Sequence, residues 1–344
     1  MRYFALTVPG LGTLLRDEIA DQVEAVGDVE HDGRSDVVPF VASPSLRIET
    51  RLAEDLFVEI GSASAAGPLS RLVGRLWSSR SYDAALPAIA RWLGRLGPRP
   101  GFHVVARVRT ERAFLRTELR EELARAVLRE RPRWRLADPA PLELWALQTR
   151  PGRVRLGVRL TDEQMRQRSG REAERPGALR PVVAAAMLRL AGLSAGMSRP
   201  LLDPCCGSGT IVREALDAGL NVVAADLDPR AIETARANLP QATRLVVADA
   251  RALPFRSGFA GAVVSNLPFG RRFPVEQPAV WLRRVFSEFE RVAAAGGAIV
   301  VLTPRSSAFA TAVLRTRAHS VRARHPIKLL GLPTTIWAFR TPRS

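Results

Sequence analysis

The sequence predicts a two-part α/β protein whose C-terminal half is a doubly wound, mainly parallel sheet. After residue 181, short apolar runs alternate with helical patterns of about ten or more residues as far as the C terminus. The first 160 residues carry strand and helix signals in a looser α+β order. A polar, arginine-rich stretch over 163–180 separates the two patterns and predicts a linker.

The first hundred residues predict strands and helices in turn. Arg2–Val8 predicts a strand, and apolar residues at helical spacing from Leu11 predict a helix. Leu46–Ile60 is typical of a helix followed by a strand. Leu69–Leu96 predicts two helices that are separated near Ser78–Ser81.

A second α+β segment begins at residue 102. A strand over Phe102–Val108 precedes a helix over Phe114–Leu128, and a hairpin is expected at Pro151-Gly152. The further strands are Trp134–Leu136, Leu142–Gln148 and Val154–Leu160.

The alternation of apolar runs and helical patterns in the C-terminal half predicts the remaining strands and helices. The strands are Pro200–Asp203, Asn221–Ala225, Ala242–Ala248, Gly261–Ser265 and Ala298–Leu302, with two closing strands near Val321 and Thr335. The helices are Pro181–Ala191, Thr210–Ala218, Pro229–Asn238, Val280–Ala295 and Ser307–Leu314. In such folds ligands bind at the carboxyl ends of the parallel strands.

The positive charge of the chain is regional. The net charge is +17, but residues 1–100 carry 11 basic and 13 acidic side chains, 101–180 carry 19 and 11, and 181–344 carry 21 and 10. Lys328 is the sole lysine, an arginine bias that genome base composition explains without changing the charge. A positive field attracts an anionic polymer, so nucleic acid is the first candidate partner and a merely soluble basic protein is the alternative.

Other protein classes are disfavoured. No apolar run has the length of a membrane span, and the Met1–Leu6 start lacks a signal-peptide pattern, so we expect a cytoplasmic protein without membrane contact. The adjacent Cys205 and Cys206 suit neither a disulfide framework nor a zinc site, and the four histidines are scattered, so no metal is expected. Nothing indicates an obligate protein partner.

Four arginines alternate through a helix end and the strand after it. They have few acidic neighbours, so a phosphate-contacting edge and a solvated loop are both open. The residues are Arg129, Arg131, Arg133 and Arg135.

A glycine turn lies where a predicted strand meets a helix, at Asp203–Thr210. The glycines let the backbone approach a ligand closely, the next strand ends in an acid suited to ribose hydroxyls, and the third ends where an adenine edge would lie. These strand ends predict an adenosine-type ligand. The residues assigned to it are Asp203, Cys205, Gly207, Gly209, Asp226, Leu227, Asp249 and Ala250.

The residues of the same turn distinguish between two candidate ligands of the adenosine type. A pyrophosphate prefers helix amides without an acid beside them, whereas Asp203 suits a sulfonium ligand with a free ammonium group. The sequence therefore favours S-adenosylmethionine over NAD.

A tetrapeptide after the apolar run Ala262–Val264 has the parts needed to bind a planar amine. Asn266 supplies a side-chain oxygen and Leu267, held by Pro268, a carbonyl, so both can accept the amine hydrogens while Phe269 stacks on the ring. This pattern predicts methylation of an amino group. The basic pair after it, Arg271 and Arg272, suits RNA phosphates or a solvated loop.

The tetrapeptide followed by Gly270, the turn Asp203–Thr210 and the motif Pro176–Pro181 resemble the THUMP-containing guanine-N2 RNA methyltransferases. Phe4–Leu11 and Phe102–Leu160 resemble the ferredoxin-like and THUMP segments of that family. The resemblance implies a ferredoxin-like segment at 1–60, a THUMP RNA-binding domain at 61–162, a linker at 163–180 and a Rossmann-like class I methyltransferase domain at 181–344.

The resemblance also implies an activity. It is S-adenosylmethionine-dependent formation of N2-methylguanosine in tRNA, in the acceptor stem near position 6, without a metal. Leucine at position 267 departs from the commoner proline of amino methyltransferases but is familiar in the tRNA guanine branch. The alternatives are the guanine-N2 methylation of 23S rRNA, methylation of a protein glutamine or small-molecule amine, and a noncatalytic RNA-binding protein.

Overall fold

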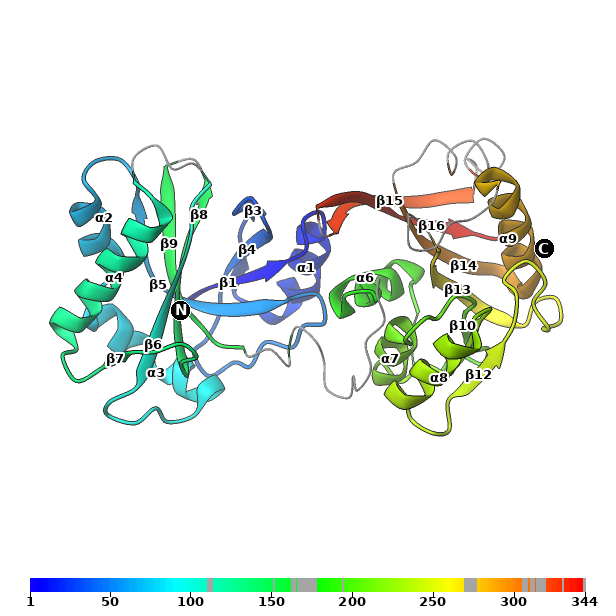
Figure 1. The fold of residues 1–344 in the computed structure, drawn as a ribbon, viewed down its shortest axis with the longest axis horizontal. Coiled ribbons are helices and arrows are strands. Elements are labelled where there is room, and N and C mark those ends of the chain that lie inside the picture. The colour runs from blue at the N-terminus through cyan, green and yellow to red at the C-terminus, as the bar shows by residue number, and fades with distance from the viewer. Residues whose placement is uncertain are drawn as a thin grey trace. The chain divides into compact units, whose positions relative to one another are not determined.

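The computed structural model divides the chain into two units, Met1–Arg166 and Gln167–Ser344, each of which we describe by itself (Figure 1). The described residues are 1–109, 114–150, 152–161, 165, 178–193, 195–268, 277–304, 309, 313, 320–329 and 331–342. Most of the predicted linker at 163–180 and much of the predicted helix Ser307–Leu314 therefore lie outside them.

The strands of the N-terminal unit form one sheet in the order β2-β4-β1-β5-β9-β8-β6-β7, with β3 paired to β4. They are β1 (Arg2–Thr7), β2 (Ala25–Val26), β3 (Glu30–His31), β4 (Asp36–Val41), β5 (Asp55–Ser64), β6 (Gly101–Arg107), β7 (Arg135–Leu136), β8 (Leu142–Arg150) and β9 (Arg153–Arg159). The helices are α1 (Gly12–Ile19), the short 3₁₀ helix η1 (Ala20–Gln22), α2 (Leu69–Leu76), α3 (Ser79–Leu93) and α4 (Arg116–Glu130).

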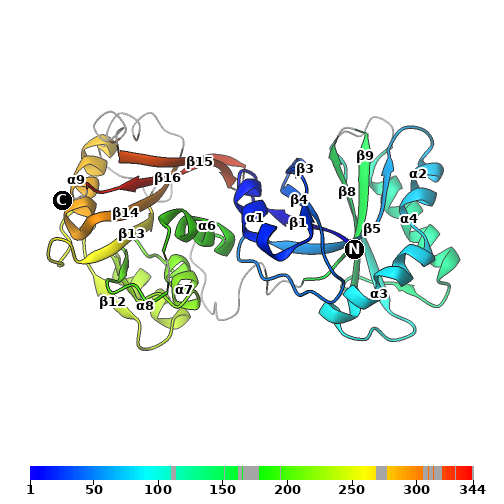
Figure 2. The same ribbon diagram turned by 180° about the vertical axis from the view of Figure 1, so that it is seen from behind.

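Helices α2, α3 and α4 cover one face of this sheet, as both views show (Figure 2). Their apolar faces supply buried side chains such as Leu72, Ile89 and Leu123. On the other face Phe4 and Phe57 stack with ring centroids 4.7 Å apart, inside a cluster that also holds Trp145. Burial of these apolar side chains from both sides stabilises the sheet.

Arginines and carboxylates also pair inside this unit. Arg155, 8% exposed, lies 2.8 Å from Glu30 and 2.5 Å from Glu59. Arg159 lies 2.7 Å from Asp55. Because a buried charge without a partner is costly, each of these pairs fixes the strands that carry it.

The structure corrects two predictions for the first sixty residues. Leu46–Glu54 contains no helix, because the carboxylate of Glu18 accepts the backbone N–H groups of Arg51 and Leu52 and holds an irregular loop. Strand β4 was not predicted. Pro39 lies inside it, and proline interrupts the usual strand pattern, although β4 pairs with β1 along its whole length.

The boundary expected at residue 60 falls within a strand of the sheet. Residue 60 is inside β5, and β5 pairs with β1 on one side and β9 on the other. The segments 1–60 and 61–162 therefore share one sheet. Their ferredoxin-like and THUMP character remains a prediction.

The C-terminal unit contains the predicted doubly wound sheet, in the order β12-β11-β10-β13-β14-β16-β15. All neighbours are parallel except β16, which is antiparallel to β14 and β15. The strands are β10 (Leu201–Asp203), β11 (Val222–Asp226), β12 (Arg244–Val247), β13 (Ala260–Asn266), β14 (Ala293–Pro304), β15 (Val321–Leu329) and β16 (Leu332–Arg340). The helices are α6 (Pro181–Ala191), α7 (Thr210–Asp217), α8 (Pro229–Asn238) and α9 (Pro278–Val292).

One large hydrophobic cluster of this unit lies between the sheet and α9. Phe286 and Phe289 of α9 are buried together with Trp337 and Phe339 of β16. Apart from small shifts at element ends, the predicted order of strands and helices is confirmed for the described part of this unit. The α/β fold class is therefore confirmed.

Candidate functional site

Four strand ends bring the predicted site residues together at one edge of the C-terminal sheet. The neighbouring strands β12, β11, β10 and β13 end at or just before Asp249, Asp226, Asp203 and Asn266, respectively. Because these strands are parallel, their carboxyl ends lie side by side, which is where ligands bind in this fold. The sequence prediction that these four residues share one site is consistent with this arrangement.

Asp203 has one carboxylate oxygen that accepts hydrogen bonds and one that accepts none from the described residues. Its Oδ1 accepts hydrogen bonds from the Ser265 hydroxyl at 2.8 Å and from the Cys205 backbone N–H at 3.2 Å. Its Oδ2 is buried and has no hydrogen-bond partner among the described residues. A buried carboxylate oxygen without a donor is costly, and a ligand with a positive donor would remove that cost.

Burial raises the pKa of Asp203 to about 7, with a further contribution from the negative charge of Asp226. The hydrogen bonds from Ser265 and Cys205 act in the opposite direction, since they favour the charged form. Near neutral pH the carboxyl group is therefore close to its midpoint. A cationic ligand beside Oδ2 would favour the ionised form.

The turn after β10 depends on two glycines with positive φ. Gly207 has φ 56° and Gly209 φ 86°, values in the left-handed region. A Cβ at position 209 would lie 2.8 Å from Leu239 Cδ1, so that position also has no room for a side chain. Asn238, the last residue of α8, stabilises the turn, because its side-chain N–H donates a hydrogen bond to the Ser208 carbonyl at 3.0 Å.

Asp226 ties the turn to the next strand. One carboxylate oxygen accepts the Gly207 N–H at 2.8 Å and the other accepts the Asp228 N–H at 3.0 Å. A carboxylate oxygen has two lone pairs, so each oxygen can accept a further hydroxyl hydrogen. The next side chain, Leu227, is 63% exposed and offers an apolar surface beside that carboxylate.

Asp249 is engaged in a way that the sequence analysis did not anticipate. Both of its oxygens lie 2.6–3.0 Å from guanidinium nitrogens of Arg251, and this pairing lowers the pKa of Asp249. Ala250, between them, is buried. The carboxylate that the sequence assigned to the adenine edge is therefore already part of an ion pair.

The predicted amine-binding tetrapeptide begins on the last residue of β13. Asn266 is half-buried, and its Oδ1 has no hydrogen-bond partner among the described residues. Leu267 is buried, and its N–H donates to the Leu302 carbonyl at 3.3 Å, which extends the pairing with β14 by one residue. Pro268 follows, half-buried, and Phe269 lies outside the described residues, as do Arg271 and Arg272.

Ser265 and Asn238 are site residues that the sequence analysis missed. Ser265 is fully buried and joins β10 to β13, which carries the start of the tetrapeptide, through its hydrogen bond to Asp203. Its signal was a lone hydroxyl at the end of an apolar strand, directly before Asn266. Asn238 lies some 30 residues from the turn that it holds, and nothing local pointed to it.

The two cysteines do not have the properties of nucleophiles. Burial raises the pKa of both thiols, and the nearby Asp203 and Asp226 raise them further. A thiol reacts as its thiolate, so a raised pKa disfavours reaction. Cys205 and Cys206 therefore serve as small side chains in the turn.

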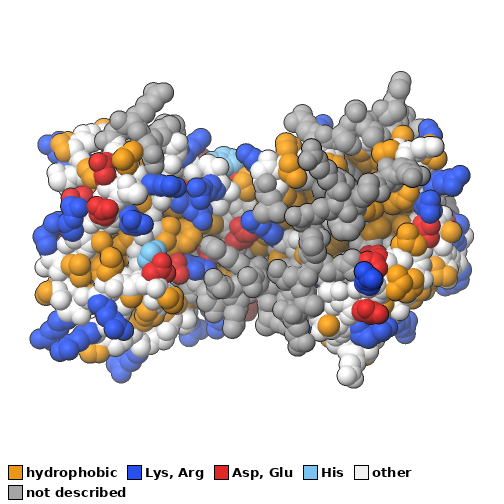
Figure 3. Space-filling view, in the orientation of Figure 1, with side chains coloured by type: hydrophobic (Ala, Val, Ile, Leu, Met, Phe, Trp, Pro, Cys, Tyr) orange, Lys and Arg blue, Asp and Glu red, His pale blue; other side chains and the backbone are white. Residues whose placement is uncertain are grey.

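The arginines predicted for RNA differ in their surroundings. Arg129, Arg133 and Arg135 are exposed, and none forms an ion pair with another described residue. Arg131 is half-buried, lies 2.5 Å from Asp83 and packs near the rings of Tyr82 and Trp134. Groups of Lys and Arg side chains are visible on this part of the unit (Figure 3).

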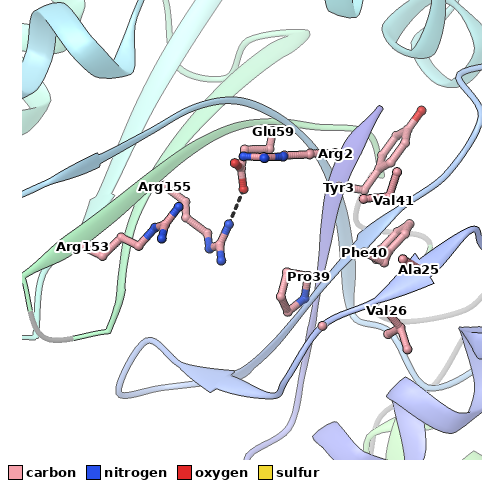
Figure 4. A pocket seen from close by; sticks show the side chains of 11 residues that line it. Arg2, Tyr3, Ala25, Val26, Pro39, Phe40, Val41, Glu59, Arg153 and Arg155 are labelled. Atoms are coloured by element: carbon pink, nitrogen blue, oxygen red, sulfur yellow. Dashed lines mark hydrogen bonds and ion pairs between the residues drawn. The ribbon is translucent and has the colours of Figure 1, made fainter.

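A separate pocket of about 340 Å³ lies in the N-terminal unit (Figure 4). Arg2, Arg153, Arg155 and Glu59 provide its charged side chains. Arg155 is bound to Glu59, and Arg153 Nε donates to a serine hydroxyl at 2.9 Å. The pocket is a hollow beside the buried ion pairs and contains none of the predicted site residues.

Comparison with protein families identifies the domain that carries the strand-end site. Residues 168–328 match the family model of the RMKL-like methyltransferase domain. This stretch is therefore similar to the methyltransferase domains of that family. It contains all four strand ends. No helix among the described residues is long and apolar enough to cross a membrane.

Two relatives match parts of the chain. The tRNA (guanine(6)-N2)-methyltransferase of Thermus thermophilus is 37% identical over 161 residues, 44% of this chain and 46% of that protein. The U6 snRNA (guanine-N(2))-methyltransferase THUMPD2 of Bos taurus is 35% identical over 131 residues, 36% of this chain and 25% of that protein. The chain thus spans less than half the length of these relatives.

Solved structures match over nearly the whole chain. The crystal structure of TrmN from Thermus thermophilus has a TM-score of 0.77 and 25% identity, covering 99% of both chains. A possible methylase from Clostridium difficile 630 has a TM-score of 0.72 at 15% identity, covering 100% of this chain and 98% of that one. The fold of the methyltransferase domain and of the unit before it therefore recurs in other proteins.

Proposed function

We propose that the protein is an S-adenosylmethionine-dependent RNA methyltransferase that forms N2-methylguanosine, with tRNA as its substrate. One observation carries the proposal. At the adjacent ends of β10 and β13, two buried acceptor oxygens, Asp203 Oδ2 and Asn266 Oδ1, have no partner among the described residues. One suits the ammonium group of a methyl donor and the other a hydrogen of the accepting amine.

The donor set fits the cofactor. Asp203 would bind the ammonium group, Asp226 the ribose hydroxyls, and Leu227 would cover one face of the adenine. Gly207 leaves the backbone open on the ligand side, because a Cβ there would contact no other atom within 4 Å. When bound, the cofactor supplies a methyl group activated on a sulfonium sulfur.

The amine would be oriented by acceptors on β13. The lone pair of a base amino group is delocalised into its ring, so the amine is a weak nucleophile. Hydrogen bonds from its two N–H groups to Asn266 Oδ1 and the Leu267 carbonyl would turn the lone pair towards the methyl group. Losing one such acceptor costs on the order of 3 kcal/mol, about a hundredfold in rate.

RNA as the substrate class follows from charge and from the relatives. The segment 101–180 carries 19 basic and 11 acidic side chains, and Arg129, Arg133 and Arg135 are exposed on it. Cationic side chains of this kind contact phosphates. The two relatives described above are named for guanine-N2 methylation of RNA, one of them of tRNA. A THUMP character of the N-terminal unit, phosphate contacts by Arg271 and Arg272, and a cytoplasmic location belong to the same proposal.

Methyl transfer to RNA tests the proposal directly. Wild type, Asn266→Ala and Asn221→Ala would be incubated with labelled S-adenosylmethionine and unmodified tRNA transcripts, and the product nucleosides identified by mass spectrometry. Asn221 is an exposed amide just before β11 and serves as the matched control. We expect N2-methylguanosine from wild type and the control, and about a hundredfold less from Asn266→Ala.

Two results would contradict the proposal. Equal labelling by wild type and Asn266→Ala would remove the assigned role of the amide. The enzyme could also be incubated with labelled S-adenosylmethionine and a cell extract. If the labelled product is then destroyed by protease but not by ribonuclease, the alternative of a protein glutamine as substrate would be favoured. Labelling of 23S rRNA but not of tRNA would keep the chemistry and change the substrate.

A further inference from the structure

The hairpin of β15 and β16 extends past the catalytic edge of the C-terminal sheet. Asn266 pairs with Leu302 of β14, Leu302 with Ile336 of β16, and Ile336 with His325 of β15. Four further residue pairs of the hairpin follow in the same direction, ending at Leu329 and Leu332. At about 3.3 Å per residue, the tip lies roughly 13 Å beyond the level of Asn266.

The hairpin also lies close to the site in the direction across the strands of the sheet. Strand β16 is the second neighbour of β13, which corresponds to a lateral distance of about 10 Å. The last two pairs, Lys328 with Pro333 and Leu329 with Leu332, lie beyond Pro304, where β14 ends. The hairpin therefore projects at the side of the substrate edge, at a distance that suits nucleotides next to the target more than the target itself.

Strand β15 carries a row of three exposed positive charges. Arg322, Arg324 and Lys328 alternate with buried or half-buried residues and are all exposed. None of them forms an ion pair with any residue that the structure describes. The chain after Glu290 contains nine Lys and Arg residues and no Asp or Glu, so no acid of the same segment can neutralise them.

The tip of the hairpin adds an apolar side chain. Leu332 is 63% exposed, directly after Gly331, whose φ of 85° turns the chain between the strands. Apolar side chains at such tips can fill the space beside a base that has left its stack. A guanine in a duplex must leave its stack to reach an active site, which costs a few kcal/mol.

Protection of the sheet edge is the competing explanation. β15 is the edge strand, and exposed charges and proline, here Pro326, discourage pairing with other chains. For edge protection, the position of the charges along the strand does not matter. It does not require an overhang with an exposed leucine at the catalytic end, and it predicts no effect on RNA affinity.

We propose that the β15–β16 hairpin binds the RNA strand flanking the target nucleotide, with Arg322, Arg324 and Lys328 on its phosphates and Leu332 against an unstacked base. The inference rests on the proposed function for its substrate class. It assigns to the hairpin a role in RNA binding and positioning that is separate from the strand-end site.

Two charge-matched variants test the row. One is Arg322→Gln/Arg324→Gln/Lys328→Gln. The other removes three exposed arginines beside the opposite edge of the same sheet, two on α8 and one on the edge strand β12, Arg230→Gln/Arg236→Gln/Arg244→Gln. Binding of an unmodified tRNA transcript would be measured at several salt concentrations, together with S-adenosylhomocysteine affinity as a check on the fold. We expect the hairpin variant to bind RNA 10- to 100-fold more weakly, with a salt slope smaller by about 2 to 3, and the control variant within about threefold of wild type.

Leu332→Ser tests the tip by methyl transfer. Its rate should fall about tenfold on a base-paired target and remain within twofold on the same guanine in an unpaired strand, because only the paired base must be unstacked. Equal RNA affinity of the two triple variants, or an equal effect of Leu332→Ser on both targets, would overturn the inference. Failure of wild type to methylate any RNA would refute the proposed function instead, and the binding comparison would still decide the role of the charged row.

Discussion

Asp203→Asn should make the protein more stable at high pH while weakening its cofactor site. Burial raises the pKa of this carboxyl from 3.8 to about 7 in the folded protein. A raised folded pKa means that the carboxyl destabilises the fold progressively as pH rises from about 4 to 7, and by a constant amount above that. A difference of about three pH units corresponds to roughly 4 kcal/mol.

The substitution removes this charge but adds a different cost. Asparagine can keep the bonds from Ser265 and Cys205 with its oxygen, but its N–H₂ group takes the place of Oδ2, where the described residues offer no acceptor. An unsatisfied buried donor costs about 1–3 kcal/mol at any pH. The variant should therefore be about 1–3 kcal/mol more stable than wild type at pH 8.5 and less stable at pH 4.5.

Urea unfolding of the cofactor-free protein at the two pH values measures this. The stability difference between variant and wild type should change by about 3 kcal/mol between pH 4.5 and 8.5. Asp217→Asn, which removes a half-exposed carboxylate on α7, is the control and should change by less than about 1 kcal/mol. If the Asp203→Asn difference is the same at both pH values, the carboxyl is not held in an environment that disfavours its charge, and the reasoning is wrong.

Three further outcomes follow from the same site. Asp203→Asn should weaken S-adenosylhomocysteine binding by about 10- to 100-fold in calorimetry at pH 8, because the ammonium group loses a charged partner; unchanged affinity would contradict the assignment. Ser265→Ala removes a bond that lowers the pKa of Asp203, so affinity should fall several-fold at pH 7 and recover by pH 8.5, whereas a general structural defect would lower it equally at both. Gly209→Ala should lower the free energy of unfolding by at least 1–3 kcal/mol, because φ is 86° and Leu239 fills the space; the control Gly74→Ala, with open space around its Cβ, should stay within about 1 kcal/mol or gain stability.

Much of the C-terminal site could be predicted because parallel strands end at the same edge. Apolar runs located the strands, and the polar residue at each end then had to face the ligand side. This reasoning placed Asp203, Asp226 and Asn266 at one edge of the sheet without any knowledge of contacts. It could not find the Ser265 bond, which depends on β10 and β13 lying side by side although 62 residues separate the two partners.

The N-terminal unit was harder to predict because its pairing is not local. β5 pairs with β1 before it and with β9 almost a hundred residues later, and no sequence period reports that. Local signals also misled in one place. The apolar residues of Leu46–Glu54 are typical of a helix, but the carboxylate of Glu18 satisfies backbone N–H groups that a helix would otherwise bond internally.

The shared strand β5 has a practical consequence for any shortened form of the protein. Removing residues 1–60 would take away β1 and part of β5 itself, and β9 would lose the partner that separates it from solvent. The Gly157–Arg159 part of this interior strand would become an open edge with free N–H and C=O groups, next to apolar side chains such as Trp145 that Phe57 now contacts. Such a fragment is expected to self-associate, so the N-terminal unit has to be studied from Met1.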